Sequence, residues 1–174
     1  MYQRLVVPLD GLELAERALV DAELLTVLTH APIHLVRVIE FADQDTYAVY
    51  GMMGDPATVS YLLTDEAASA SQYLESVVQC VAAQGHLVTS EVRHGSVADQ
   101  LIAIAQPGDL YIMASHGRRG VARWFLGSVA EDVVRRSPVS VLLVKSLPWF
   151  HAVADQSVAG EIQKQVSPFL APQR

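Results

Sequence analysis

Apolar and polar positions alternate along the chain between two distinct patterns. Short runs rich in β-branched residues, at positions 5–7 and 33–39, predict strands. Between them, the apolar residues of positions 13–29 recur at spacings of three and four, which predicts an amphipathic helix. Further helices are expected at 61–84, 97–105 and 128–136, and further strands at 86–92, 110–113 and 139–144. The predicted order is therefore β-α-β-α-β-α-β-α-β.

This order predicts a fold and the place of its binding site. The strands are almost continuously apolar, which indicates a sheet covered on both faces, and their alternation with helices indicates parallel crossovers. We therefore expect an α/β fold with a doubly wound five-stranded parallel sheet in the order 3-2-1-4-5. Such sheets bind ligands where the strands end at their carboxyl side, so the loops after the first, second and fourth strands should form the site. The segment 41–60 fits neither pattern and is expected to be a loop, with a possible role as a lid.

Composition narrows the class of protein. The 174 residues are 51% apolar, enough for one domain with a proper core, which we place at 1–146 with an extension at 147–174. The net charge of −7 argues against a general nucleic-acid binder, which needs a basic face. No apolar run is long enough for a signal peptide or a membrane span, so a cytoplasmic protein without a membrane partner is expected. Cys80, the only cysteine, lies among valines and is expected to be an inert buried thiol.

The segment after the fourth strand has the composition of an anion site. It contains Gly117, Gly120 and Gly127, and half of the ten arginines fall between positions 118 and 136. Gly127-Ser128 would open a helix, whose free N–H groups and positive dipole end attract a phosphate. Two structural alternatives stay open. Ser128 and Glu131 could form a capping box that uses the same N–H groups, and the arginines could pair with Glu131 or Asp132 on a solvated face.

Four segments together resemble the universal stress protein family. They are residues 5–19, the His116-Gly117-Arg118 step, the Gly127-Ser128 pair and the closing run Ser-Pro-Val-Ser-Val-Leu-Leu-Val, and the resemblance extends from Tyr2 to about Lys145. It implies an adenine nucleotide alpha hydrolase-like fold that binds ATP or AMP. The binding motif is Gly-x-x-Gly followed, after nine residues, by Gly-Ser or Gly-Thr. The chain departs from this pattern at Ala114, in place of the first glycine, and at Leu12, where the family often has serine.

The resemblance also implies a set of binding residues. Pro8 and Asp10 would border the adenine and ribose, the main chain of Val38 would bind the adenine edge, and Met113 would lie under the ring. The phosphates would be held on both sides of the fourth crossover by Gly117, Gly127, Ser128 and Val129. His116 and Arg118 would add contacts, and Ala114 would lie near the path of the phosphates. The residues alone leave other roles open, namely an N-cap for Asp10, strand termination for Pro8, and ordinary core for Val38 and Met113.

Other classes of site find little support in the sequence. Both lysines, Lys145 and Lys164, lie beyond the candidate loop, which excludes a Walker A site, and only Gly11 follows the first strand, which argues against NAD. His30 and His34 are separated by Pro32, so no metal site is expected. No Gly-x-Ser-x-Gly elbow occurs. Any Mg²⁺ would arrive with the phosphates, and ATP hydrolysis would be slow at most, since Asp10 is the only acid expected nearby.

The last strand and the residues after it point to self-association. An apolar strand from Val139 to Val144 at a sheet edge would be an aggregation hazard unless another chain covered it, so a homodimer is expected. The family resemblance implies antiparallel pairing of this strand. The extension carries Trp149, Phe150 and further large apolar residues, and is expected to clasp a partner or cover its own sheet. The alternatives to a nucleotide-binding regulatory dimer are a dimeric adaptor with a pocket impaired by Ala114, and an enzyme of related architecture.

Overall fold

The computed structural model describes residues 1–40, 56–115 and 127–145, and it contains five strands and four helices in these ranges. The strands are β1 (Arg4–Pro8), β2 (Ile33–Ile39), β3 (Val88–His94), β4 (Asp109–Ser115) and β5 (Ser140–Lys145). The helices are α1 (Glu13–Thr29), α3 (Pro56–Ala83), α4 (Val97–Ala103) and α5 (Ser128–Arg136). The predicted alternation of strands and helices is confirmed.

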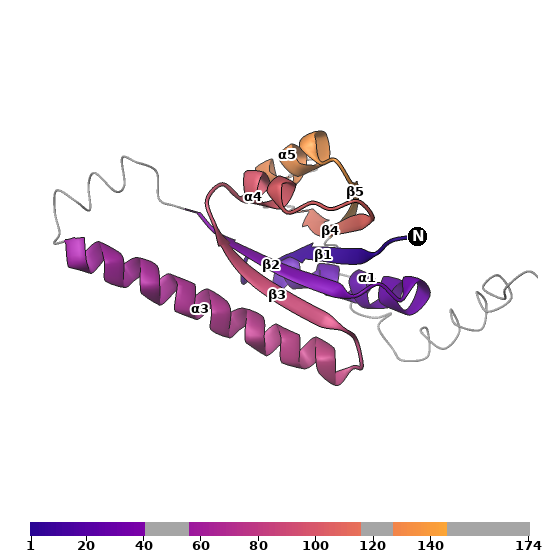
Figure 1. The fold of residues 1–174 in the computed structure, drawn as a ribbon, viewed down its shortest axis with the longest axis horizontal. Coiled ribbons are helices and arrows are strands. Elements are labelled where there is room, and N and C mark those ends of the chain that lie inside the picture. The colour runs from indigo at the N-terminus through magenta and orange to yellow at the C-terminus, as the bar shows by residue number, and fades with distance from the viewer. Residues whose placement is uncertain (41–55, 116–126, 146–174) are drawn as a thin grey trace, which may run out of the picture.

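The five strands form one parallel sheet in the order β3-β2-β1-β4-β5. This is the predicted topology, and the order reverses between β1 and β4. Helices cover both faces, with α1 and α3 on one side and α4 and α5 on the other (Figure 1). All strands therefore end at the same edge of the sheet, next to the first turn of α5.

A separate apolar core fills each side of the sheet. On one side, small residues of α1 such as Ala18 and Ala22 let that helix approach β1 and β4 closely, while Leu74 of α3 is 1% exposed. On the other side, Leu101 of α4 and Val133 of α5 pack on the fully buried Tyr111. Every residue of β4 except the last is buried, as the continuous apolar pattern predicted.

Two local predictions are wrong. Helix α3 begins at Pro56 rather than near Tyr61, so the end of the predicted loop is helical, because proline suits the first turn of a helix. Cys80 is exposed, not buried, because the α3 positions that face the sheet are Leu74, Val77 and Val81. The rest of the predicted loop, 41–55, lies outside the described residues, and so do the segments 116–126 and 146–174.

Candidate functional site

A pocket of about 630 Å³ lies at the carboxyl end of the strands. This size falls within the range of small-molecule sites. It is lined by eight of the residues predicted from the sequence: Pro8, Asp10, Val38, Met113, Ala114, Gly127, Ser128 and Val129. They come from β1, β2, β4 and α5, so the fold brings together positions more than 100 residues apart. The other three predicted residues, His116, Gly117 and Arg118, lie outside the described ranges.

The backbone of Val38 faces the pocket without a described strand partner on the β1 side. β2 pairs with β3 as far as Ile39, but its pairing with β1 ends at Val36. The Val36 carbonyl accepts from Leu9 N on the β1 side at 2.8 Å, and the Ile39 carbonyl accepts from Gly95 N on the β3 side at 3.0 Å. Because backbone groups alternate in direction along a strand, Val38 turns its N–H and C=O toward the β1 side, beyond the end of the ladder. An adjacent donor and acceptor are thus open to a ligand.

Helix α5 presents its free amides to the same pocket. Gly127 is the N-cap and has no side chain to cap the helix, so the capping box of Ser128 and Glu131 is not formed. Ser128 is instead the first helical residue. The first intrahelical bond runs from Glu131 N to the Gly127 carbonyl at 2.9 Å, which leaves the N–H groups of residues 128–130 without helical acceptors. Such a helix end attracts an anion.

The arginines at the far end of α5 have structural partners. Arg135 and Arg136 contact Asp132 at 3.1 and 2.7 Å, and Arg136 also contacts Asp99 of α4 at 2.5 Å. These contacts hold the pKa values of Asp99 and Asp132 below their usual range, chiefly through hydrogen bonds from the arginines. The expected pairing with Asp132 is confirmed, so these two arginines bind carboxylates and lie at the opposite end of α5 from the pocket.

The turn after β1 carries Asp10 into the pocket wall. The Asp10 carboxylate accepts from Leu12 N at 2.9 Å, and Leu12, not Asp10, is the N-cap of α1. A leucine side chain cannot cap a helix, and Leu12 is 54% exposed. Gly11 has a φ of +82°, and a Cβ at this position would lie 2.5 Å from Nη1 of Arg37. The conformation of the turn therefore favours glycine, and a Cβ there would require the end of the Arg37 side chain to shift.

Arg37 is a pocket residue that sequence reasoning missed. Its guanidinium lies 5.4 Å from the ring centroid of Tyr73, and its Nε and Nη1 are buried without a hydrogen-bond partner. Tyr73 donates to Glu16 at 2.8 Å, and burial together with this bond raises the pKa of Tyr73 well above its usual range. These residues connect α3, α1 and β2 beneath the turn that holds Asp10. An arginine inside an apolar strand was the available signal.

Two further carboxylates, Glu40 and Glu66, also line the pocket. Glu40 follows β2 and Glu66 belongs to α3. With Asp10 they make the wall formed by β1, β2 and α3 acidic, while the wall formed by α5 offers backbone amides. The pocket is thus electrostatically polar: an anionic group is favoured beside α5, and hydrogen-bond donors are favoured at the other side.

Ala114, the main departure from the family pattern, does not close the pocket. It is 7% exposed, lies in the extended strand β4 opposite Val144, and lines the pocket wall. Among the described residues that are not glycine, His30 is the one with a positive φ, so the backbone at 114 does not demand glycine. Its methyl group adds bulk to one wall of a cavity that stays about 630 Å³ in volume.

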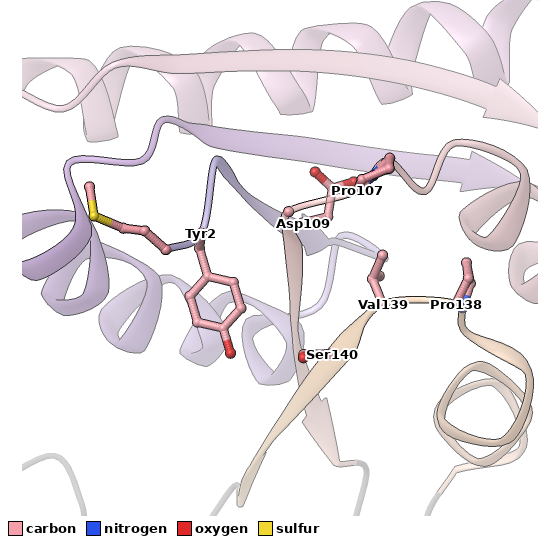
Figure 2. A pocket seen from close by; sticks show the side chains of 8 residues that line it. Tyr2, Pro107, Asp109, Pro138, Val139 and Ser140 are labelled. Atoms are coloured by element: carbon pink, nitrogen blue, oxygen red, sulfur yellow. The ribbon is translucent and has the colours of Figure 1, made fainter.

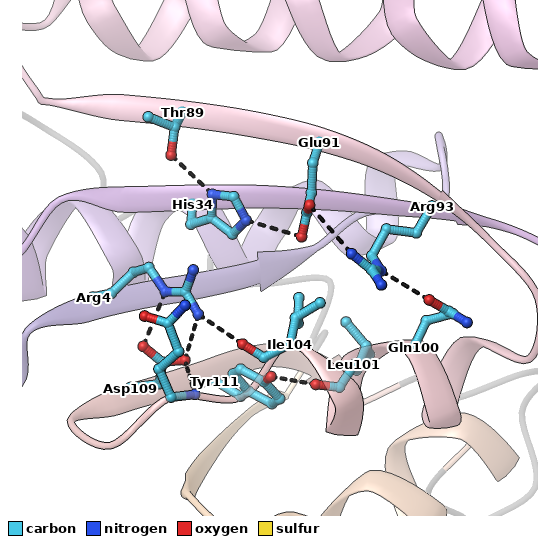
Figure 3. A network of polar contacts seen from close by, with 11 residues as sticks. Arg4, His34, Thr89, Glu91, Arg93, Gln100, Leu101, Ile104, Asp109 and Tyr111 are labelled. Atoms are coloured by element: carbon cyan, nitrogen blue, oxygen red, sulfur yellow. Dashed lines mark hydrogen bonds and ion pairs between the residues drawn. The ribbon is translucent and has the colours of Figure 1, made fainter.

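A polar network occupies the other end of the sheet (Figure 3). Arg4 of β1 binds Asp109 of β4 through two contacts of 3.0 and 2.7 Å and also donates to the Ile104 carbonyl at 2.9 Å. The Asp109 carboxylate accepts in addition from Gln106 N at 2.9 Å. Neither side chain of this pair has a buried polar atom without a hydrogen-bond partner. No cluster of three metal-ligating side chains occurs in the described ranges, and none of the helices within them is apolar and long enough to cross a bilayer.

Comparison with known proteins identifies the family. The family model described as "Universal stress protein family" matches residues 1–145. The chain belongs to the universal stress protein family. Two universal stress proteins of Methanocaldococcus jannaschii are similar to it: MJ0531 is 27% identical, with 83% of both chains covered, and MJ0577 is 28% identical, with 83% of this chain and 96% of the relative covered.

Solved structures show the same fold. The structure of MJ0577 has a TM-score of 0.66 at 28% identity and covers 84% of this chain and 98% of its own. The universal stress protein UspA from Lactobacillus plantarum has a TM-score of 0.65 at 23% identity, covering 82% and 97%. The family match ends at the last residue of β5. One relative, the putative universal stress protein SH1215 of Staphylococcus haemolyticus, is 26% identical over 95% of this chain, which extends into the residues after β5.

Proposed function

We propose that this universal stress protein binds an adenine nucleotide, ATP or AMP, in the pocket at the carboxyl end of its sheet. The observation that carries the proposal is the convergence of two sets of unpaired backbone groups on one cavity. Val38 offers an adjacent donor and acceptor, which match the edge of an adenine ring, and residues 128–130 offer amides to a phosphate. Neither depends on a particular side chain.

The walls of the pocket support the orientation of the ligand. Met113 and Pro8 provide apolar surface for a purine, and Asp10 is placed to accept from ribose hydroxyls while it also accepts from Leu12 N. Two proteins with this fold were solved with adenine nucleotides, one with cAMP at 23% identity and one with dAMP at 17% identity. The fold therefore accommodates such ligands in those proteins. Gly117, His116 and Arg118 follow β4 in sequence and would add contacts to the phosphates.

The chemistry at the site favours binding over catalysis. Asp10 accepts a backbone hydrogen bond at the sugar end, so no described carboxylate lies in the α5 wall to activate a water beside a terminal phosphate. We expect slow ATP hydrolysis at most, with any Mg²⁺ carried by the phosphates. We further propose a cytoplasmic homodimer paired through β5, in which bound nucleotide changes a regulatory contact. Residues 1–146 would form its domain and 147–174 an extension of the interface.

Two substitutions at Ser128 test the binding mode. Ser128→Pro removes one backbone amide at the first helical position, where proline is well tolerated, and Gly127 already has the φ of −58° and ψ of 148° that a residue before proline adopts. We expect calorimetry to show AMP binding weakened about tenfold or more, the value of a charge-assisted hydrogen bond. The control Ser128→Ala keeps the amide and loses only the hydroxyl, and should weaken binding less.

The adaptor alternative makes the opposite prediction. If Ala114 spoils the site, the wild-type chain gives no heat with AMP or ATP, purifies without nucleotide, and Ala114→Gly gains affinity. If the pocket is functional, the wild-type chain binds and Ala114→Gly changes affinity only slightly, because the alanine methyl leaves the cavity open. Equal binding by wild type, Ser128→Ala and Ser128→Pro would contradict the proposed role of the α5 amides.

A further inference from the structure

A second hollow, of about 490 Å³, lies at the amino end of the sheet, opposite the proposed nucleotide pocket. Figure 2 shows the Tyr2 ring on one side of it and Val139 and Pro138 on the other. Asp109 also lines it, but its carboxylate is taken up by Arg4 at 2.7 Å and by Gln106 N at 2.9 Å. The lining thus combines proline, tyrosine and valine side chains with a neutralised acid, which suits an apolar or aromatic occupant.

The hollow opens beside a sheet edge that no described strand covers. β5 pairs with β4 on one side and is the last strand of the sheet. Its sequence is mostly apolar, and Leu142 is 37% exposed. The opposite edge, β3, carries Glu91 and Arg93, which pair with each other at 3.5 Å. Charged side chains protect an edge from association, so β5 is the edge that fits a second copy of this chain.

Symmetry then dictates what lies next to the hollow. Two identical edge strands related by a two-fold axis pair antiparallel. The start of β5, Ser140, lines the hollow and lies opposite Leu110 of β4. In an antiparallel pair centred on β5, the end of the second copy's strand, Lys145, comes to lie beside Ser140. The residues that follow Lys145 in the sequence are Ser-Leu-Pro-Trp-Phe.

We propose that Trp149 and Phe150 of a second copy fill the hollow and clasp the dimer. This proposal rests on the β5-paired dimer put forward above. Within one subunit, Lys145 lies about 17 Å along β5 from Ser140, since a strand advances about 3.3 Å per residue, so the adjoining residues of the same chain start at the wrong end. Large aromatic side chains bury about 150–250 Å² each and commonly dominate the energy of an interface. The clasp is reciprocal, with one hollow filled on each subunit.

Crosslinking between two differently labelled chains tests the arrangement. In a Cys80→Ser background, which removes the exposed native thiol, one chain carries Ser140→Cys and the other carries Leu147→Cys. The mixed sample, treated with a short thiol-to-thiol crosslinker, should give a product of twice the chain mass on a denaturing gel. Each chain alone should give little, because its two like cysteines lie far apart in an antiparallel pair. As a comparison, one chain carries both substitutions. If this chain crosslinks within itself and the mixed sample gives no crosslink, the proposal is overturned.

The dimer dissociation constant, measured on the full chain by sedimentation, supplies the second test. Trp149→Ala should raise it at least about tenfold, and the control Phe169→Ala, farther along the same extension, should raise it much less. Tyr2→Ala should also weaken the dimer. The double variant should raise the dissociation constant by less than the product of the two single fold-changes, because the two side chains share one contact. Additive effects would overturn the contact.

The outcomes separate this proposal from the nucleotide site and from the dimer itself. A chain that stays monomeric at high concentration refutes the clasp together with the β5 dimer, while AMP binding stands or fails on its own titration. A dimer that persists unchanged in Trp149→Ala and gives no mixed crosslink refutes the clasp alone. A mixed crosslink together with a weakened Trp149→Ala dimer supports it, whether or not nucleotide is bound.

Discussion

The two ends of the sheet differ in whether their polar groups have hydrogen-bond partners. At the amino end, Arg4 and the buried Asp109 have no buried polar atom without a partner, and they also bind a carbonyl and a backbone amide (Figure 3). At the carboxyl end, the backbone of Val38 lies beyond the ladder, the first turn of α5 has no cap, and Arg37 has two buried nitrogens without partners. Satisfied groups stabilise the fold, and the unpaired backbone groups at the edge of the pocket are available to a ligand, whereas the two Arg37 nitrogens are buried.

Removing the carboxylate at the amino end should have the largest effect. Asp109→Ala leaves the Arg4 guanidinium, itself only 20% exposed, without its partner, and breaking such a pair costs about 3–5 kcal/mol. Urea unfolding should show a loss of this size, while the affinity of the folded protein for AMP stays unchanged. The variant Arg4→Met with Asp109→Leu should recover part of the loss. A loss below about 1 kcal/mol would contradict the distinction between the two ends.

Substitutions at two glycines with similar backbone conformations should distinguish an effect on stability alone from an effect on binding. Gly11 at φ +82° and Gly85 at φ +89° both lie in the left-handed region, which costs a residue with a Cβ about 1–2 kcal/mol, so both changes to alanine should destabilise the fold. At Gly85 nothing lies within 4 Å of the added Cβ, whereas at Gly11 it meets Arg37 at 2.5 Å. Gly11→Ala should therefore be the less stable variant on urea unfolding. It should also weaken AMP binding by displacing the Asp10 turn, and Gly85→Ala should leave binding unchanged.

The smallest effect on stability is expected at Arg37. Arg37→Met keeps an unbranched stem, loses a cation–π contact of about 0.5–1 kcal/mol with Tyr73, and removes two buried donors that lack partners. These contributions oppose each other, so the free energy of unfolding should change by less than about 1 kcal/mol. A loss as large as that of Asp109→Ala would show that Arg37 is a structural group like Arg4.

Much of the architecture could be predicted from the chain alone because its signals are local. The apolar runs of β1, β2 and β4 and the spacing of Ala18 and Ala22 in α1 follow from the periods of strands and helices. The predictions were wrong where contacts with other elements decide the conformation of a residue. Cys80 lies among valines in the sequence but turns away from the sheet, and Ser128 has a capping-box partner three residues on but takes the first helical position instead of the N-cap.

The candidate site likewise contains residues that the sequence identified and residues that it did not. Eight of its residues could be named from the sequence, because four segments resemble the universal stress protein family and that resemblance implies the binding residues. Glu40 and Glu66 could not, since they belong to a strand end and a helix whose local sequence carries no sign of a pocket. For Arg37 the one signal was an arginine inside an apolar strand. Only packing of α3 and the β1 turn against β2 brings them there.

By itself, the sequence determined the order of strands and helices, the parallel sheet and the edge where a ligand would lie, because hydrophobic period and connection handedness are properties of short segments. The tertiary structure decided which polar groups are satisfied. The end of one ladder at Val36 and the pair of Arg4 and Asp109 depend on strand register, which couples residues distant in sequence, 105 positions apart for Arg4 and Asp109. The first turn of α5 comes to lie in the pocket only through packing.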